Sequence, residues 1–139
     1  MSEVHPYVLI VEADEDNRYL LYSAFSHSGW AVPLKFMDSG ELALKYLQQL
    51  SPPFYPSLII LDMNMPGLNG HEVLALIRKG ESMKEIPVMF YSSSMKPVVK
   101  ELLLALGAAG CFEKPDELEK VVQVAADYIQ VSKAALLRE

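Results

Sequence analysis

The chain has 139 residues, a formal net charge of −6, 51% hydrophobic residues and one cysteine, which fits one folded domain and excludes an internal disulfide. The longest apolar stretch, residues 102–112, is about half as long as a membrane span, and the N-terminus lacks the basic-then-apolar pattern of a signal peptide. We therefore expect a cytoplasmic protein that contacts no membrane. We also expect no contact with nucleic acid, because phosphate binding needs clustered Lys and Arg and this chain is acidic.

Strand-like and helix-like segments alternate along the chain, which is typical of an α/β fold with a parallel sheet. Residues 7–11 form a continuous apolar run, as in a strand buried on both faces. A helix is predicted over residues 16–28, and its inward stripe is Leu20, Leu21, Ala24 and Phe25. Pro33 places the next strand, residues 31–37, at an edge of the sheet. Ser39 is the expected N-cap of a second helix, whose inward residues are Leu42, Ala43, Tyr46, Leu47 and Leu50.

The second half of the chain continues the alternation. Residues 58–61 are the most clearly buried strand, and a loop over 62–69 and a helix over 70–79 follow it. A fourth strand covers residues 88–91. Pro97 suits the first turn of the next helix, whose expected apolar face is Val98, Val99, Leu102, Leu103 and Leu106. Residues 110–113 are a short fifth strand, and a last helix begins at about Asp116. One domain is therefore expected over residues 1–139.

Polar residues stand where the predicted strands end. Glu12 and Asp14 follow the first strand, Asp62 ends the third, Ser92 ends the fourth and Lys114 ends the fifth. Right-handed crossovers bring the carboxyl ends of parallel strands to one edge of the sheet, where ligands bind. Carboxylates, a hydroxyl and an ammonium at one edge suit Mg²⁺ binding and phosphoryl transfer to an aspartate.

Each of these residues also has a simple structural interpretation. Asp14 can cap the next helix, Ser92 can belong to a turn, and Lys114 can be an ordinary solvated side chain. Asp62 is the hardest to explain in this way, because an unpaired charge directly after four buried apolar residues is costly. The placement of all of them at strand ends favours a shared site.

Taken in order, these segments resemble the receiver domain of two-component response regulators from end to end. Residues 8–12 resemble its first strand and acidic cluster, and residues 58–70 (LIILDMNMPGLNG) resemble its phosphoacceptor strand and loop. Residues 86–93 resemble its fourth strand with the switch hydroxyl, and residues 107–115 resemble the approach to its lysine. The resemblance implies a flavodoxin-like, doubly wound sheet of five parallel strands in the order 2-1-3-4-5, flanked by five helices.

The resemblance also implies a role for each residue. Asp62 would accept a phosphoryl group from a sensor histidine kinase or a phosphotransfer protein. Mg²⁺ would be held by Glu12, Asp62 and the backbone carbonyl of Asn64, with Asp14 as a further candidate. Ser92 would hydrogen-bond the phosphoryl group, and Lys114 would pair first with Asp62 and then with that group. The face formed by the fourth helix, fifth strand and fifth helix would then control binding of a downstream signalling protein.

Two positions depart from the family. Its first strand is followed by two adjacent acidic residues, the second of which is a direct metal ligand, whereas this chain reads Glu12-Ala13. We therefore expect weaker Mg²⁺ binding. The family's switch aromatic on the fifth strand falls at Cys111, which we expect to be a small packing residue. Phe112 cannot replace the aromatic, because adjacent strand residues face opposite sides.

The leading hypothesis is a stand-alone phosphoacceptor receiver that has no output domain and is not an enzyme, beyond slow phosphoryl transfer to and from itself. The first alternative is a degenerate receiver that binds its partner independently of phosphorylation, because of Ala13. A phosphoaspartyl hydrolase ranks last, since no insertion is present that would enclose a substrate. The last helix also carries a second apolar stripe, which contacts a dimer mate or a signalling partner or is an ordinary exposed surface. Its residues are Val124, Tyr128, Val131 and Ala135.

Overall fold

The computed structural model describes residues 6–30, 32–114 and 116–137, with side chains described as far as Ile129. Within these residues, five strands and five α-helices alternate as predicted. They are β1 (Val8–Val11), α1 (Glu15–His27), β2 (Leu34–Met37), α2 (Gly40–Gln48), β3 (Leu58–Leu61), α3 (Gly70–Lys79), β4 (Val88–Ser92), α4 (Pro97–Ala105), β5 (Gly110–Glu113) and α5 (Leu118–Leu137). A short 3₁₀ helix, η1 (Met83–Glu85), precedes β4 and was not predicted.

The five strands form one parallel sheet in the order β2-β1-β3-β4-β5, which confirms the predicted flavodoxin-like topology. The register aligns the carboxyl ends of the strands. Val11 pairs with Met37 on one side and with Leu61 on the other, and Leu61 pairs with Phe90. The residues that follow these strands are therefore brought to the same edge of the sheet.

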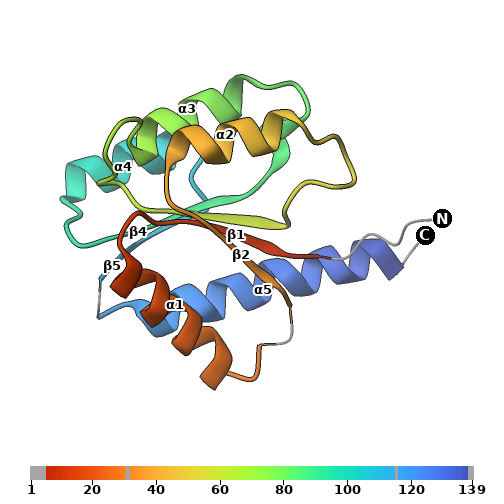
Figure 1. Cartoon of the computed structure of the whole chain (residues 1–139), viewed down its shortest axis with the longest axis horizontal. Coiled ribbons are helices and arrows are strands. Elements are labelled where there is room, and N and C mark those ends of the chain that lie inside the picture. The colour runs from red at the N-terminus through yellow and green to blue at the C-terminus, as the bar shows by residue number, and fades with distance from the viewer. Residues whose placement is uncertain (1–5, 31, 115, 138–139) are drawn as a thin grey trace.

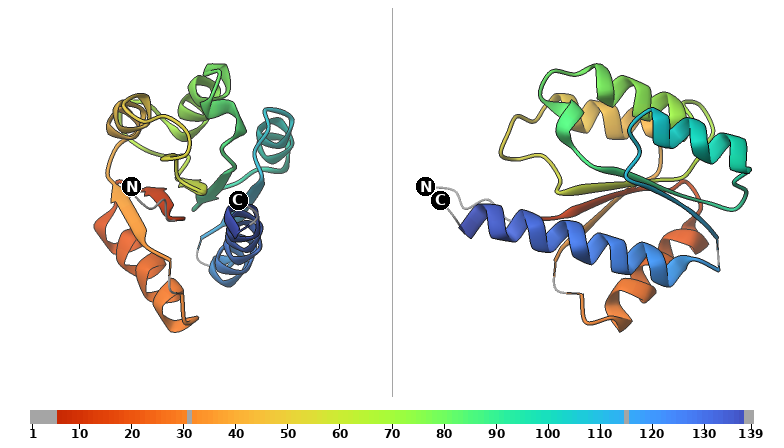
Figure 2. Two further views of the ribbon diagram at one scale, coloured as in Figure 1. Left: turned by 90° about the vertical axis from the view of Figure 1, so that its right-hand side faces the viewer. Right: turned by 180° about the vertical axis from the view of Figure 1, so that it is seen from behind.

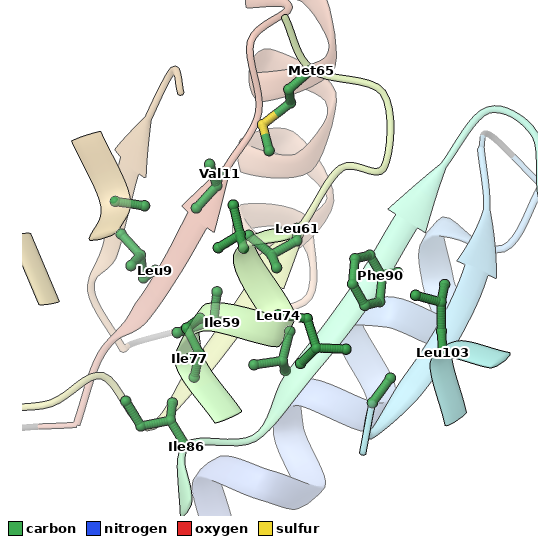
Figure 3. Close-up of a cluster of buried hydrophobic side chains, with 14 of the residues drawn as sticks. Leu9, Val11, Ile59, Leu61, Met65, Leu74, Ile77, Ile86, Phe90 and Leu103 are labelled. Atoms are coloured by element: carbon green, nitrogen blue, oxygen red, sulfur yellow. The ribbon is translucent and has the colours of Figure 1, made fainter. Parts of the chain in front are cut away.

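Helices cover both faces of the sheet. Helices α2, α3 and α4 lie on one face, and α1 and α5 lie on the other (Figures 1 and 2). Successive residues of a strand point to opposite faces, so Leu9 and Val11 enter one core while Val8 and Ile10 enter the other. We call these the α2–α4 core and the α1–α5 core. Figure 3 shows the α2–α4 core, in which Leu61, Leu74 and Phe90 lie between the sheet and α3.

Local signals in the sequence set most of the element ends. The Ser39 side chain accepts a hydrogen bond from the amide of Leu42 (3.1 Å), which confirms Ser39 as the N-cap of α2. Strand β2 is an edge strand, as Pro33 predicted, but it begins only at Leu34. Proline lacks an N–H, so Pro33 contributes only its carbonyl, which accepts from the amide of Val8 (3.0 Å). The predicted first residue of that strand, Ala31, lies outside the described residues.

The predicted apolar face of α4 is wrong in part. Leu103 is buried and Val99 is half-buried, whereas Val98 is 69% exposed and Leu102 is 61% exposed. Leu106 is also exposed. Helix α4 covers β5, the last strand of the sheet, so it has a packing partner along only one narrow stripe. The apolar residues beside that stripe therefore remain in contact with solvent.

Smaller errors of the same kind affect α1 and α2. Leu20 and Leu42 were assigned to inward stripes, but they are 45% and 50% exposed. Leu44, which was not assigned inward, is buried in α2. A periodic apolar pattern gives the approximate direction of the buried face, and the neighbouring elements then decide its width.

Only part of the second stripe of α5 can be placed. Val124 and Tyr128 are half-buried and pack against the α1–α5 core, so they are not fully available to a partner. Val131 and Ala135 lie outside the described side chains. None of the described helices is long and apolar enough to cross a membrane.

Candidate functional site

The candidate site lies at the carboxyl edge of the sheet, where four of the predicted residues meet. Asp62 directly follows β3, Glu12 directly follows β1, and Lys114 directly follows β5, while Ser92 is the last residue of β4. They are spread over more than a hundred residues of sequence, and the parallel register alone brings them together.

Lys114 joins the two carboxylates of the site. Its Nζ lies 2.5 Å from Oε1 of Glu12 and 3.1 Å from Oδ2 of Asp62. The Lys114 and Glu12 side chains are only 7% and 2% exposed. Charges buried to this extent are tolerated when they are paired and hydrogen-bonded. The charge at Asp62 therefore has a partner, and the interpretation of Lys114 as an ordinary solvated side chain is wrong.

Burial shifts the pKa values of two groups at the site, Glu12 and Tyr91. The pKa of Glu12 is raised above its ordinary value by burial, and the nearby Asp62 carboxylate adds to this, while the Lys114 ammonium opposes it. Tyr91 lies under the lysine, with the ammonium 5.4 Å from its ring centroid. Burial, together with the charge of Glu12, raises the pKa of Tyr91 to about 12, so its hydroxyl remains protonated at neutral pH.

A closed circuit of hydrogen bonds links four residues of the site. The backbone N–H of Asn64 donates to Oδ1 of Asp62 (3.1 Å), and the side-chain Nδ2 of Asn64 donates to Oγ of Ser92 (3.2 Å). The backbone N–H of Lys114 donates to the carbonyl of Ser92 (2.8 Å), and its ammonium completes the circuit at Asp62. Both oxygens of Asp62 are therefore held in a fixed orientation.

Asp14 does not join this group, which corrects its candidacy as a metal ligand. Its side chain accepts hydrogen bonds from the amides of Asp16 (2.8 Å) and Asn17 (3.1 Å), so it is the N-cap of α1. Its own amide donates to Oε2 of Glu12 (3.1 Å). The structural interpretation of Asp14 was correct. The backbone amide of Asp14 orients Glu12, while the carboxylate of Asp14 caps α1.

The remaining donor set is small for a metal. Across the described ranges, no group of three or more His, Cys, Asp or Glu side chains is close enough to hold a metal ion. Glu12 and Asp62 are the two carboxylates that share Lys114, and Ala13 supplies no third. Mg²⁺ keeps several waters and needs one or two carboxylates. The residues therefore fit a divalent ion, with fewer protein ligands than the family pattern has.

The structure bears out the expected packing of Cys111 and Phe112. Cys111 is 3% exposed and lies in the α2–α4 core, and Phe112 packs on the opposite face of the sheet. Burial raises the pKa of the Cys111 thiol above its ordinary value of 9.0, although the positive charge of Lys100 acts in the opposite direction. A small thiol therefore stands where the family has its switch aromatic.

Two contacts of the site were missed from the sequence. The Arg18 guanidinium donates from one nitrogen to the carbonyls of Glu12 (2.8 Å) and Ala13 (3.1 Å), which fixes the loop after β1. The link between Asn64 and Ser92 was also missed. Asn64 lies just after β3 and Ser92 ends β4, and these strands are neighbours in the expected order. The strand order was therefore the signal that could have predicted this second contact.

A cavity of about 800 Å³ lies between α1 and α5, away from the candidate site. Its lining includes His27, Trp30, Leu118 and Gln123, and it contains none of the residues at the carboxyl edge of the sheet. The cavity is therefore separate from the candidate site around Asp62.

The chain matches the family model of the response regulator receiver domain over residues 8–126. It is 30% identical over 89 residues to the probable methanogenesis regulatory protein FilR2 of Methanothrix harundinacea, and this match covers 63% of the chain and 57% of FilR2. The chain spans smaller shares, 33% and 23%, of two longer relatives, a methylesterase of Trichodesmium erythraeum and a probable cyclic di-GMP phosphodiesterase of Vibrio cholerae. Those relatives contain sequence well beyond the matched part.

Two solved structures are similar over most of their length. The Mn²⁺-bound form of response regulator Rcp1 is 28% identical with a TM-score of 0.73, and the match covers 85% of this chain and 89% of Rcp1. The phosphorylated cyanobacterial phytochrome response regulator RcpA is 26% identical with a TM-score of 0.73, and the match covers 94% of this chain and 93% of RcpA.

Proposed function

The chain belongs to the response regulator receiver domain family of two-component signalling, and on this premise we propose that Asp62 accepts a phosphoryl group from a histidine kinase or a phosphotransfer protein. The observation that carries the proposal is the buried pair of Asp62 with Lys114, which lies beside Glu12 and Ser92. Receiver domains interact with such kinases or phosphotransfer proteins, and they typically bind a divalent metal.

The proposed reaction is a transfer of one phosphoryl group between two side chains. A carboxylate oxygen of Asp62 forms a bond to phosphorus while the bond from phosphorus to the donor imidazole breaks, and the electron pair of that bond remains on the imidazole nitrogen. Lys114 moves from Oδ2 of Asp62 to a phosphoryl oxygen, and the Ser92 hydroxyl donates to another. A bound Mg²⁺, held by Glu12, Asp62 and the Asn64 carbonyl, would neutralise charge on the phosphoryl oxygens.

The proposed output is binding of a downstream signalling protein at the face formed by α4, β5 and α5. Helix α4 supports this proposal, because Val98 and Leu102 are exposed there beside the strand that carries Cys111. A rearrangement at Ser92 would alter this face through the loop that joins β4 to α4. Apart from transfer to and from Asp62, we propose no catalytic turnover.

Acetyl phosphate and Mg²⁺ test the phosphoacceptor directly. We expect the intact mass of the protein to rise by one phosphoryl group, and we expect Asp62→Asn to abolish this gain, because the amide is not a nucleophile toward phosphorus. Asp16→Asn, which changes an exposed acid of α1, is the matched control and should retain the gain. No gain in the native protein, or a gain that survives Asp62→Asn, would contradict the proposal.

A second candidate is a degenerate receiver that binds its partner without phosphorylation. Ala13 favours this candidate, because it removes a carboxylate from the metal site and leaves Lys114 bonded to both of the others. Partner binding would then be unaffected by Asp62→Asn, whereas the phosphoacceptor hypothesis requires that substitution to change it.

Ala13→Asp measures how much the missing carboxylate matters. We expect this variant to bind Mg²⁺ at least about 10-fold more tightly, since even the loss of an outer-shell partner has an effect of that size. The affinity can be measured by following the amide resonances of residues 12–14 and 62–64 during a Mg²⁺ titration. Equal affinities in the native protein and the variant would rule out the degenerate candidate as we explain it.

A further inference from the structure

We propose that the Asn64 side chain is a positioning residue, which holds the Ser92 hydroxyl at the phosphoacceptor with its proton available for donation. The proposal rests on the proposed function of Asp62, and it assigns to the side chain of Asn64 a role separate from that of its backbone carbonyl. The observation behind it is the hydrogen bond from Nδ2 of Asn64 to Oγ of Ser92 (3.2 Å).

The burial of Ser92 makes this contact important. Ser92 is 0% exposed, and buried hydroxyl groups in proteins are almost always hydrogen-bonded. Within the described residues, Asn64 supplies the one side-chain hydrogen bond to that hydroxyl. Asn64 itself is exposed, so its side chain reaches inward from the surface of the β3–α3 loop to the end of β4. Without Asn64, the buried hydroxyl oxygen would lose this side-chain donor.

The polarity of the bond determines what Ser92 can do. An amide nitrogen is only a donor, so the Ser92 oxygen must accept, and its own proton is not used in this contact. A phosphoryl group on Asp62 would present acceptor oxygens only. The Asn64 amide therefore selects the orientation of the hydroxyl that can donate to that group.

The backbone of Asn64 places this interaction next to the reacting carboxylate. Its N–H donates to Oδ1 of Asp62 (3.1 Å), so one residue orients both the acceptor oxygen and the hydroxyl. The carbonyl of Ser92 is held independently by the N–H of Lys114 (2.8 Å). The main chain of Ser92 is thus fixed by β5, and the direction of its hydroxyl is left to Asn64.

A double-mutant cycle tests the proposal. We expect Asn64→Ala to slow labelling by acetyl phosphate by roughly two- to tenfold, which is the range of one ordinary hydrogen bond. In a Ser92→Ala background the same substitution should have no further effect, because the hydroxyl on which it acts is absent. Ser93→Ala, which removes the neighbouring exposed hydroxyl, is the matched control, and the full effect of Asn64→Ala should persist in that background.

A second measurement does not depend on phosphorylation. In the native protein without phosphodonor, Ser92→Ala should shift the side-chain NH₂ resonances of Asn64, and Ser93→Ala should leave them in place. Unshifted resonances would overturn the proposed contact, and equal effects of Asn64→Ala with and without the Ser92 hydroxyl would overturn the positioning role. If the native protein takes up no phosphoryl group, the function proposed for Asp62 fails and the positioning role fails with it, while the resonances still decide whether the contact exists.

Discussion

At the scale of single residues, the Lys114 ammonium makes two buried carboxylates possible at the end of the sheet. Glu12 and Asp62 each lie within hydrogen-bonding distance of this ammonium, and removing such a partner from buried charges is strongly destabilising.

Gly70 also has a local role, which is steric. A Cβ on Gly70 would lie 2.5 Å from the carbonyl oxygen of Asp62 and 2.8 Å from the ring of Phe90. The loop that begins at Asp62 can therefore pack against the start of α3 only because residue 70 has no side chain.

The buried thiol of Cys111 should react slowly while the protein is folded. The Cys111 thiol is buried and its pKa is raised above 9.0, and the thiolate is the reactive form. We expect a thiol reagent at pH 8 to modify the native protein much more slowly than the chain unfolded in urea. The Cys111 thiol loses its proton near pH 9 in the unfolded chain and at a higher pH in the folded protein. The contribution of the buried neutral thiol to the free energy of unfolding is therefore fully present below about pH 9, and it is lost as the pH rises further.

The measurement is unambiguous, because the chain has a single cysteine. Cys111→Ala should remove both the modification and this part of the alkaline loss of stability. Rapid modification of the native protein at pH 8 would show that β5 opens readily, which would contradict the buried packing of the thiol.

At the scale of elements, α4 is held mainly at its C-terminal end. Its N-cap, Lys96, makes no side-chain capping bond, and Leu103 is its one fully buried residue. The Arg78 guanidinium of α3 donates to the carbonyls of Gly107 and Ile86, both at 2.9 Å. Burial lowers the pKa of Arg78 somewhat, with Glu85 opposing this, but a guanidinium remains charged. Arg78 thus ties the end of α4 to the segment before β4.

Arg78→Met should loosen that end of α4. Two carbonyls would lose a charged donor, and we expect the free energy of unfolding to fall by about 1–3 kcal/mol. Hydrogen exchange should become faster at the amides of residues 106–108. Lys79→Met, which changes the exposed neighbouring residue of α3, is the matched control and should leave both quantities nearly unchanged. Unaltered exchange in Arg78→Met would mean that Leu103 alone holds the helix.

At the scale of the whole molecule, both helical layers pack against β3, the strand that ends directly before Asp62. Ile59 and Leu61 of β3 enter the α2–α4 core, and Leu58 and Ile60 enter the α1–α5 core. A movement of Asp62 would therefore disturb both cores. Helix α4 covers only the edge of the sheet and has Leu103 as its one buried residue, so a shift of α4 would disturb few buried contacts.

The order of the elements, and the residues that stand at the strand ends, can be predicted from the amino-acid sequence. Local physics is sufficient for this, because hydrophobic period, capping residues and prolines act over a few positions. The pattern around Asp62 further identified the family, and with it the strand order. The residues Asp62, Ser92 and Lys114 could therefore be selected before any distance was known.

The hydrogen-bond partners of these residues and the width of each buried face depend instead on how the folded chain packs. Asp14 caps α1, Asn64 donates to Ser92, and Lys114 joins both carboxylates, and each of these outcomes depends on side-chain directions that sequence spacing does not specify. Val98 and Leu102 are exposed because α4 lies at the edge of the sheet, where no further element of the described part of the chain covers it. Contacts between distant segments depend on how whole layers pack, so they are settled only when the complete chain has folded.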